Sequence, residues 1–256
     1  MNLSADLFVA GASFVASGIN AAAGGGSFIS FPAILATGVA PISANATNNV
    51  AMWLGSFAST GSFRSEIDIP RKTLVRMLVT SALGSTIGAI VLLRTSNATF
   101  AGLIPFLLLV ATVVFVAGPA LTKSVRDGTQ PMKLDSPLGL GLQFAIAAYG
   151  GFFGAAIGIL MLALLGILGM HNLRRANAFK VLLATVINGV AVIPFVAARV
   201  IAWEPAAFMS AGAIAGGFLG AGLVKRLPSN VVRAFVIVVA CTMTAYFFWA
   251  TYVRRS

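Results

Sequence analysis

Charged residues are scarce in this chain of 256 residues. Only 9% of the positions carry Asp, Glu, Lys or Arg, and six residues are acidic. A soluble domain usually has about a quarter of its residues charged. The chain therefore has too few charges to cover a water-facing surface of this length, which argues against a soluble enzyme.

Cysteine and histidine occur once each, as Cys241 and His171. A single cysteine forms no intramolecular disulfide, which excludes a disulfide-rich secreted module. One histidine and six scattered acids supply neither a metal-binding set nor a general base for the plentiful Ser and Thr residues. The glycine-rich strings also lack the flanking residues of phosphate-binding and dinucleotide-binding loops. We therefore expect no enzymatic activity, no cofactor and no metal.

Hydrophobic residues, in contrast, make up 59% of the chain, and the mean hydropathy is +0.97. The net charge of +11 would suggest a nucleic-acid partner in a soluble protein. Here the bases lie between long apolar runs, as in the loops of membrane proteins, so we expect a lipid bilayer and no nucleic acid. The N-terminal string MNLSAD lacks the basic region of a cleavable signal. The sequence indicates an all-α polytopic membrane protein and specifies no oligomeric state.

Six apolar segments have about the length of 20 residues that a membrane-crossing helix needs. They are Ala46–Ser62, Leu74–Leu93, Phe100–Leu121, Ala176–Ala198, Ala206–Val224 and Val231–Val253. Two longer stretches, Leu7–Ala40 and Leu138–Met170, are interrupted by glycine clusters. Because a glycine inside a helix costs about 1 kcal/mol relative to alanine, each cluster marks a bend, a break or a close helix contact.

The two halves of the chain match at a constant shift of 132 residues. The string Ala-Asn-Ala at 44–46 falls on 176–178, and the GxxxGA pattern at 84–89 falls on 216–221. Composition alone produces scattered Gly and Ala matches, whereas these two patterns in one register indicate an internal duplication. We assign residues 1–122 to a first membrane repeat, 123–137 to a cytoplasmic linker and 138–256 to a second membrane repeat.

The basic residues predict how the repeats are oriented. If each repeat crosses the membrane an odd number of times, thirteen of the seventeen bases share one side and only Arg94, Arg199, Arg254 and Arg255 lie opposite. An even number divides them ten against seven. The positive-inside rule favours the first arrangement, which gives two inverted repeats with both termini outside the cytoplasm. Each repeat then has a glycine-broken helix pair, as a membrane hairpin or two tilted crossings, plus three transmembrane helices.

Inverted repeats with broken helices are typical of transporters. A helix that begins at such a break presents free N–H groups and a positive dipole end, which suits an anion. Hydroxyl and amide side chains near the breaks add further donors. We expect the substrate to bind at Gly24, Gly25, Gly26, Ser27, Asn45, Thr47, Asn48, Gly154, Gly158 and Asn177.

Purely structural roles are the alternative explanation for three groups of residues. Asn45 and Thr47 can be helix N-caps. Lys180 can be a cytoplasmic topology anchor whose side chain reaches the interface. The glycines can serve helix packing alone, in which case the chain is a non-transporting membrane assembly or partner-binding subunit.

The acids fall in predicted loops or at the edges of spans, whereas proton or sodium coupling usually places a carboxylate in the middle of one. We therefore hypothesise that transport is not proton-coupled through a buried carboxylate. An anion that leaves a cell with a negative interior gains about 2.3 kcal/mol per charge per 100 mV.

The segment GGGSFISFPAILATGVAPISANATNNVA, residues 24–51, resembles the first signature of the TauE/SafE family of membrane proteins. The segment from Gly150 to Val190 resembles the second-repeat counterpart, with a departure at Ile159, where another glycine is expected. The resemblance covers essentially the whole chain. It implies a permease of the bacterial cytoplasmic membrane for a small anion such as sulfite or an organosulfonate, mostly exported.

Overall fold

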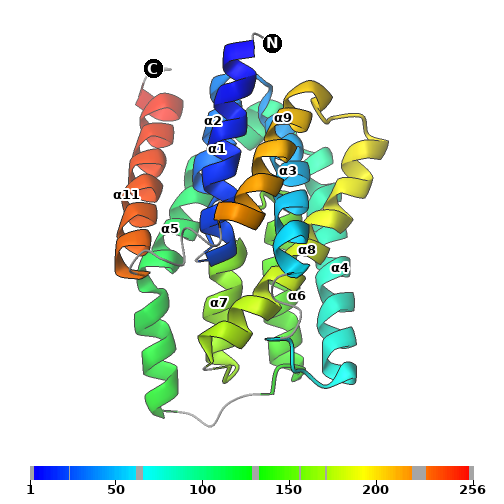
Figure 1. The fold of residues 1–256 in the computed structure, drawn as a ribbon, viewed down its shortest axis with the longest axis vertical. Coiled ribbons are helices and arrows are strands. Elements are labelled where there is room, and N and C mark those ends of the chain that lie inside the picture. Colours follow the sequence, from blue (N-terminus) through cyan, green and yellow to red (C-terminus); the bar gives the residue numbers. More distant parts are fainter. Residues whose placement is uncertain are drawn as a thin grey trace.

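A computed structural model describes residues 3–22, 24–61, 66–128, 133–155, 157–170, 172–220 and 229–253 (Figure 1). Within these ranges the chain forms ten α-helices and two π-helical segments, and no strand. The helices are α1 (Leu3–Ala22), α2 (Ser27–Ala36), α3 (Pro41–Gly61), α4 (Arg71–Leu93), α5 (Asn97–Gly128), α6 (Pro137–Phe152), α7 (Ile157–Ile167), α8 (Leu173–Ala197), α9 (Trp203–Ala215) and α11 (Ser229–Phe248). The π-helical segments η2 (Gly216–Gly220) and η3 (Trp249–Val253) continue α9 and α11.

Five helices of the described chain are long and apolar enough to cross a membrane: Leu3–Ala21, Arg71–Leu93, Asn97–Ala117, Arg174–Ala197 and Val231–Val253. The predicted all-helical, multi-pass class is therefore confirmed. The segment predicted as Ala46–Ser62 is α3, which begins five residues earlier, at Pro41. The segment predicted as Ala206–Val224 begins within α9 and continues through η2, and its last residues lie outside the described ranges.

Both glycine-interrupted stretches consist of two helices, as predicted. Helix α1 ends at Ala22 before α2 begins at Ser27, and α6 ends at Phe152 before α7 begins at Ile157. With 10 and 11 residues, α2 and α7 are about 15 to 17 Å long, too short to cross a hydrocarbon core of about 30 Å. In Figure 1, α1 and α2 occupy the upper part of the molecule, and α6 and α7 the lower part.

Helix starts recur at the interval that relates the two halves of the sequence. Helices α3, α4 and α5 begin at residues 41, 71 and 97, and α8, α9 and α11 begin at 173, 203 and 229, which are 132 residues later in each case. Thr112 on α5 and Thr244 on α11, also 132 residues apart, share a hydrogen bond of 3.1 Å between their hydroxyls. Helix α5 continues to Gly128 and so includes the first residues of segment 123–137.

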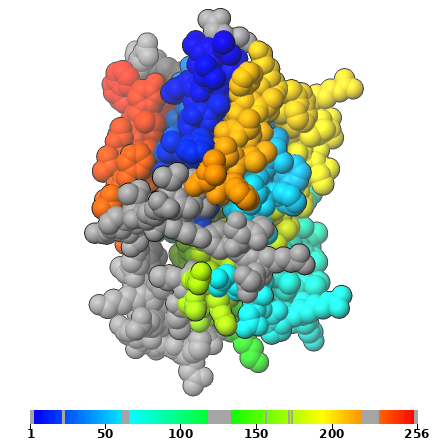
Figure 2. Space-filling model, viewed as in Figure 1, coloured from blue at the N-terminus to red at the C-terminus, as the bar shows by residue number. Residues whose placement is uncertain are grey.

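The halves exchange packing partners: α4 packs against α6, and α9 against α1. Figure 2 shows α1 (blue) and α9 (orange) side by side on one face. Glycines allow both contacts, because a Cβ on Gly88 would overlap the carbonyl oxygen of Ala148, and one on Gly212 that of Ala10. Small residues at such positions let helix backbones approach closely where apolar burial drives no association.

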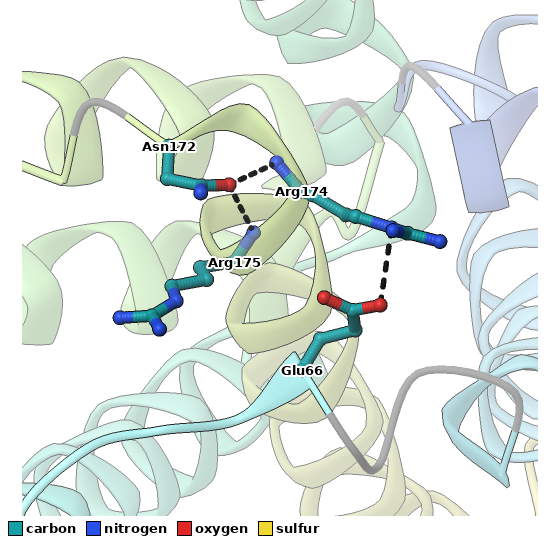
Figure 3. A network of polar contacts seen from close by, with 4 residues as sticks. All are labelled: Glu66, Asn172, Arg174 and Arg175. Carbon is teal, nitrogen blue, oxygen red and sulfur yellow. Dashed lines mark hydrogen bonds and ion pairs between the residues drawn. The ribbon is translucent and has the colours of Figure 1, made fainter.

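Ion pairs and a helix cap join residues at one end of the bundle, where the connections between α3 and α4, α5 and α6, and α7 and α8 lie. Asn172 Oδ1 caps α8 by accepting from the amides of Arg174 and Arg175, at 3.0 and 3.1 Å (Figure 3). Arg174 Nε lies 3.0 Å from Glu66 Oε1, and Arg175 Nη1 lies 3.2 Å from Asp68 Oδ2. We call this the basic end; its described bases are Arg71, Lys72, Arg76, Lys133, Arg174 and Arg175.

The ion pair between Arg76 Nη1 and Asp135 Oδ2, at 2.9 Å, brings the start of α4 and the connection before α6 to this same end. At the other end, Asn97 Oδ1 accepts from the amide of Ile42 at 3.0 Å and so joins the starts of α3 and α5. Helix α1 begins and η3 ends at that end too, at the top of Figure 1.

Gly88→Ala tests the close contact between α4 and α6. The added methyl group overlaps a backbone carbonyl, and overpacking of this kind typically costs about 1–3 kcal/mol. Thermal unfolding in detergent should show a lower Tm for this variant. Gly141→Ala is the matched control, because nothing lies within 4 Å of its Cβ position and alanine is the better helix former. Equal Tm values for the two variants would contradict the packing described.

Candidate functional site

The first break depends on glycines in the left-handed region. Gly24 and Gly25 have φ of +81° and +85°, a conformation that side chains with a Cβ rarely adopt. Gly24 closes α1 by donating its amide to Ile19 O at 3.2 Å. The amides of Phe28 and Ile29 donate to the carbonyls of Gly25 and Gly26, at 3.1 and 2.8 Å. These two donors are thus paired within the turn, and free donors at this helix start have to precede Phe28.

The second break lies at Gly154, before Gly158. Gly154 has φ of +72° and donates to Tyr149 O at 3.4 Å, which closes α6 as Gly24 closes α1. Helix α7 then begins at Ile157, so Gly158 is the second residue of that helix. The departure from the family pattern at Ile159 therefore falls inside α7, after the break.

The two breaks meet. A Cβ on Gly24 would lie 3.1 Å from the amide nitrogen of Ile159 and 3.2 Å from the carbonyl carbon of Gly158. A Cβ on Gly158 would lie 3.4 Å from Gly24 Cα. The turn after α1 and the first turn of α7 are therefore in van der Waals contact, which brings Gly24 and Gly158 of the predicted site together.

Lys180 lies beside this junction, although the prediction left it out of the site. Its side chain is 1% exposed, and its Nζ donates to Asn20 O, in the last turn of α1, at 2.8 Å. Its Cδ lies 3.1 Å from the Cβ position of Gly158. The interpretation of Lys180 as an anchor reaching the interface is therefore wrong. The sequence did contain a signal for a place in the site. Lys180 lies within an apolar span, six residues after Arg174, and it is in register with Asn48.

Asn45 and Asn177 occupy equivalent positions and make reciprocal contacts. Asn45 Nδ2 on α3 donates to Phe152 O, the last residue of α6, at 3.2 Å. Asn177 Nδ2 on α8 donates to Ala21 O, near the end of α1, at 2.9 Å. Each amide thus satisfies a helix-end carbonyl of the other half, and each Oδ1 is buried without a partner among the described residues. The N-cap interpretation of Asn45 is wrong because α3 begins at Pro41.

Asn48 and Asn49 place further amide groups in the same region. Both side chains are buried, and Asn48 Oδ1 and both polar atoms of Asn49 have no partner in the described structure. Asn49 Nδ2 lies 3.3 Å from the Cβ position of Gly154, at the second break. Asn49 is thus a donor that the predicted site missed; its spacing of four from Asn45, which puts both on one face of α3, was the available signal.

The remaining predicted residues have other contacts. Thr47 also lies inside α3, so its N-cap interpretation is wrong as well, and its Oγ1 accepts from the amide of Ala202, just before α9, at 3.0 Å. A Cβ on Gly26 would overlap the carbonyl oxygen of Ala16, so this glycine serves the close approach of α1 and α2. Ser27 is buried as the first residue of α2.

A small polar cavity lies next to Lys180. Its volume is about 10 Å³, which is close to the minimum for one water molecule. Ser17 and Asn20 from α1, Ser56 and Ser59 from α3, and Lys180 from α8 supply its polar lining. The cavity therefore lies between the two halves and borders the only lysine buried in the described part of the chain.

Comparison with known proteins gives a consistent result. The profile of the family described as Sulfite exporter TauE/SafE matches residues 9–247. The chain is 32% identical over 247 residues to a "Probable membrane transporter protein" of Haemophilus influenzae, an alignment that covers 96% of this chain and 94% of that protein. It is 27% identical to the "Probable membrane transporter protein YfcA" of Escherichia coli K12, over 89% of this chain and 83% of that protein.

A third relative, the "Probable membrane transporter protein ORF9" of Sinorhizobium sp, is 26% identical over 94% of this chain and 91% of its own length. No solved structure matches. A family profile that covers almost the whole chain, together with relatives matched nearly end to end, shows that the chain belongs to the Sulfite exporter TauE/SafE family of membrane transporters.

Proposed function

We propose that the chain carries a small anion, a sulfur-containing oxyanion or an organosulfonate, across the bacterial cytoplasmic membrane. The substrate would bind between two inverted repeats, where the glycine breaks meet. The observation that carries the proposal is the contact of Gly24 with Gly158 beside a buried lysine and the unpartnered amide donor of Asn49. A buried cation, and a buried amide donor without a partner such as Asn49 Nδ2, are costly unless a ligand compensates them, and an anion would satisfy both.

The inverted arrangement is supported by the ends at which equivalent helices begin. Helix α8 begins at the basic end with Arg174 and Arg175, whereas its counterpart α3 begins at the opposite end, beside Asn97. Helix α4 begins at the basic end with Arg76, whereas its counterpart α9 begins after Ala202, which bonds to α3 near its start. Equivalent helices that start at opposite ends are expected of repeats related by an axis in the membrane plane.

The positive-inside rule makes the basic end cytoplasmic in this proposal. The segment 123–137 would then link the repeats on the cytoplasmic side, and both termini would lie on the other side. Of the described acids, Asp6 alone is buried, and it lies in the first turn of α1, at the edge of a span. The hypothesis that no mid-membrane carboxylate couples transport to protons is compatible with this position.

The choice of a sulfur oxyanion rests on the name of the family and on the cationic, amide-rich surroundings of the breaks. The alternative, a partner-binding subunit without transport, predicts polar groups scattered in pairs over the helix contacts. Such pairs exist, as between Thr60 and Thr185, at 3.0 Å. Lys180, Asn49 and Asn177, however, all lie near the breaks and on the helices α3 and α8, which pack against each other. This concentration favours a transporter.

Cysteine accessibility tests the inverted topology. Cys241 is exposed and is first replaced by serine, after which single cysteines are placed at Arg76, Arg174 and Arg94. A membrane-impermeant maleimide applied to intact cells should label position 94 but neither 76 nor 174, and everted vesicles should give the reverse. Labelling of 76 and 174 from opposite sides would overturn the inverted arrangement.

Asn49→Leu tests the site at the breaks. Uptake of labelled sulfite or methanesulfonate by inside-out vesicles should fall at least tenfold, because the change removes a donor that faces the second break. The Tm should stay the same or rise, since replacing a buried amide that has no partner by an apolar group of similar shape is near neutral or stabilising. Unchanged uptake would remove Asn49 from the site.

Asn172→Ala is the control for Asn49→Leu. Loss of the N-cap of α8 costs about 0.5–2 kcal/mol, so its Tm should fall. Uptake per folded molecule should be unchanged, because Asn172 lies at the basic end and only caps a helix.

A further inference from the structure

We propose that Lys180 selects singly charged oxyanions over doubly charged ones, because it supplies the one fixed positive charge of the binding site. The inference rests on the proposed transport function and names its substrate class more closely. Lys180 enters from α8, its aliphatic stem passes over Gly158, and its ammonium group ends at the C-terminus of α1.

The surroundings of Lys180 leave its charge largely uncompensated. Three ion pairs of the described chain join arginines to Glu66, Asp68 and Asp135 at the basic end, and none of these three includes Lys180. The partner of Lys180 is a neutral carbonyl, Asn20 O. The C-terminus of a helix carries about half a negative charge through its dipole. It therefore compensates the ammonium only in part, and a bound anion would complete the compensation.

Comparison of the two halves indicates that the proposed site contains one positive charge. Lys180 corresponds to Asn48 under the shift of 132 residues, and Asn48 is buried with an unpartnered Oδ1. Asn20, whose carbonyl holds Lys180, corresponds to Phe152, whose carbonyl is held by Asn45. The carbonyl at this position of each half is thus held by a polar side chain of the other half, Lys180 in one case and Asn45 in the other, and only the second half contributes a cation. A monoanion gives a neutral complex with Lys180, whereas a dianion leaves one buried negative charge without a partner, which is unfavourable.

The cavity beside Lys180 indicates how an anion would gain access. Its volume of about 10 Å³ is small for an oxyanion, since even one water molecule needs about that much. The end of α1 therefore has to withdraw from α8 for a substrate to enter. An anion oxygen would then replace Asn20 O as the partner of the ammonium group, so that Lys180 exchanges a helix-end carbonyl for the substrate.

The test compares two ions of similar chemistry and different charge, methanesulfonate and sulfate. Purified protein is reconstituted into proteoliposomes at a clamped membrane potential, and the influx of each labelled ion is measured by counterflow. We expect the unaltered protein to carry methanesulfonate at least tenfold faster than sulfate. Lys180→Gln should lose at least nine-tenths of the methanesulfonate flux, with an unchanged or higher Tm, because a buried cation without a counter-ion has been removed.

Charge exchange between the half-sites provides the sharpest variant. In the double variant N48K/K180N the single cation moves to the equivalent position of the first repeat. Methanesulfonate transport and its preference over sulfate should recover relative to Lys180→Gln. Arg233→Gln is the control for loss of one positive charge elsewhere; Arg233 is only partly buried and donates to Val116 O, so the selectivity ratio should remain that of the unaltered protein.

The outcomes separate this inference from the function on which it rests. If the unaltered protein carries an anion but Lys180→Gln retains the rate and the selectivity ratio, the role of Lys180 is refuted and the transporter proposal stands. If the unaltered protein moves neither these ions nor sulfite, and none of them raises its Tm, both proposals are refuted. A methanesulfonate-dependent rise in Tm that Lys180→Gln abolishes and N48K/K180N restores would support the inference independently of flux.

Discussion

A helix that ends in the protein interior leaves carbonyl groups that need partners from other parts of the chain, and the ends of α1 and α6 obtain such partners from α3 and α8. Asn45 on α3 donates to the end of α6, and Asn177 on α8 donates to the end of α1. Each half thus satisfies a carbonyl at the broken helix of the other, which stabilises both breaks. The same reciprocity accompanies the packing of α3 against α8 and the contact of the turn at Gly24 with Gly158.

The helix contacts across the halves follow the same exchange. Helix α4 lies against α6 and α9 against α1, at distances that only glycines such as Gly88 and Gly212 permit. In lipid, helix association depends on close packing and on interhelical hydrogen bonds more than on apolar burial. The glycine content therefore has two separate uses: Gly24 and Gly154 supply backbone conformations, whereas Gly88 and Gly212 supply space. Gly158 combines closeness to the other break with room for the Lys180 stem.

Charged residues also occur in two different settings, in ion pairs at the basic end and, for Lys180, in the interior. The acids Glu66, Asp68 and Asp135 pair with arginines at the basic end, where water and salt reduce the energy of each pair. Lys180 is held in the interior by a backbone carbonyl and amide-lined surroundings. The proposed site would attract a negatively charged solute through this cation, and the three described acids that pair with arginines lie at the basic end and not beside it. The proposed anion specificity and the proposed absence of carboxylate coupling thus have one physical origin.

The sequence by itself determined the membrane class, the two broken helices, the shift of 132 residues and the family, because hydropathy, glycine clusters and register are properties of the linear chain. Only the tertiary structure decided which polar groups meet. Lys180 follows two exposed arginines along the chain and resembles them in sequence, but the end of α1 covers it. From the sequence, Asn45 and Thr47 could be helix caps, but α3 begins at Pro41 and both residues lie inside it. Asn49 became a candidate for the proposed site only because Gly154, at the second break, lies against α3, a contact between residues about a hundred positions apart that no local pattern encodes.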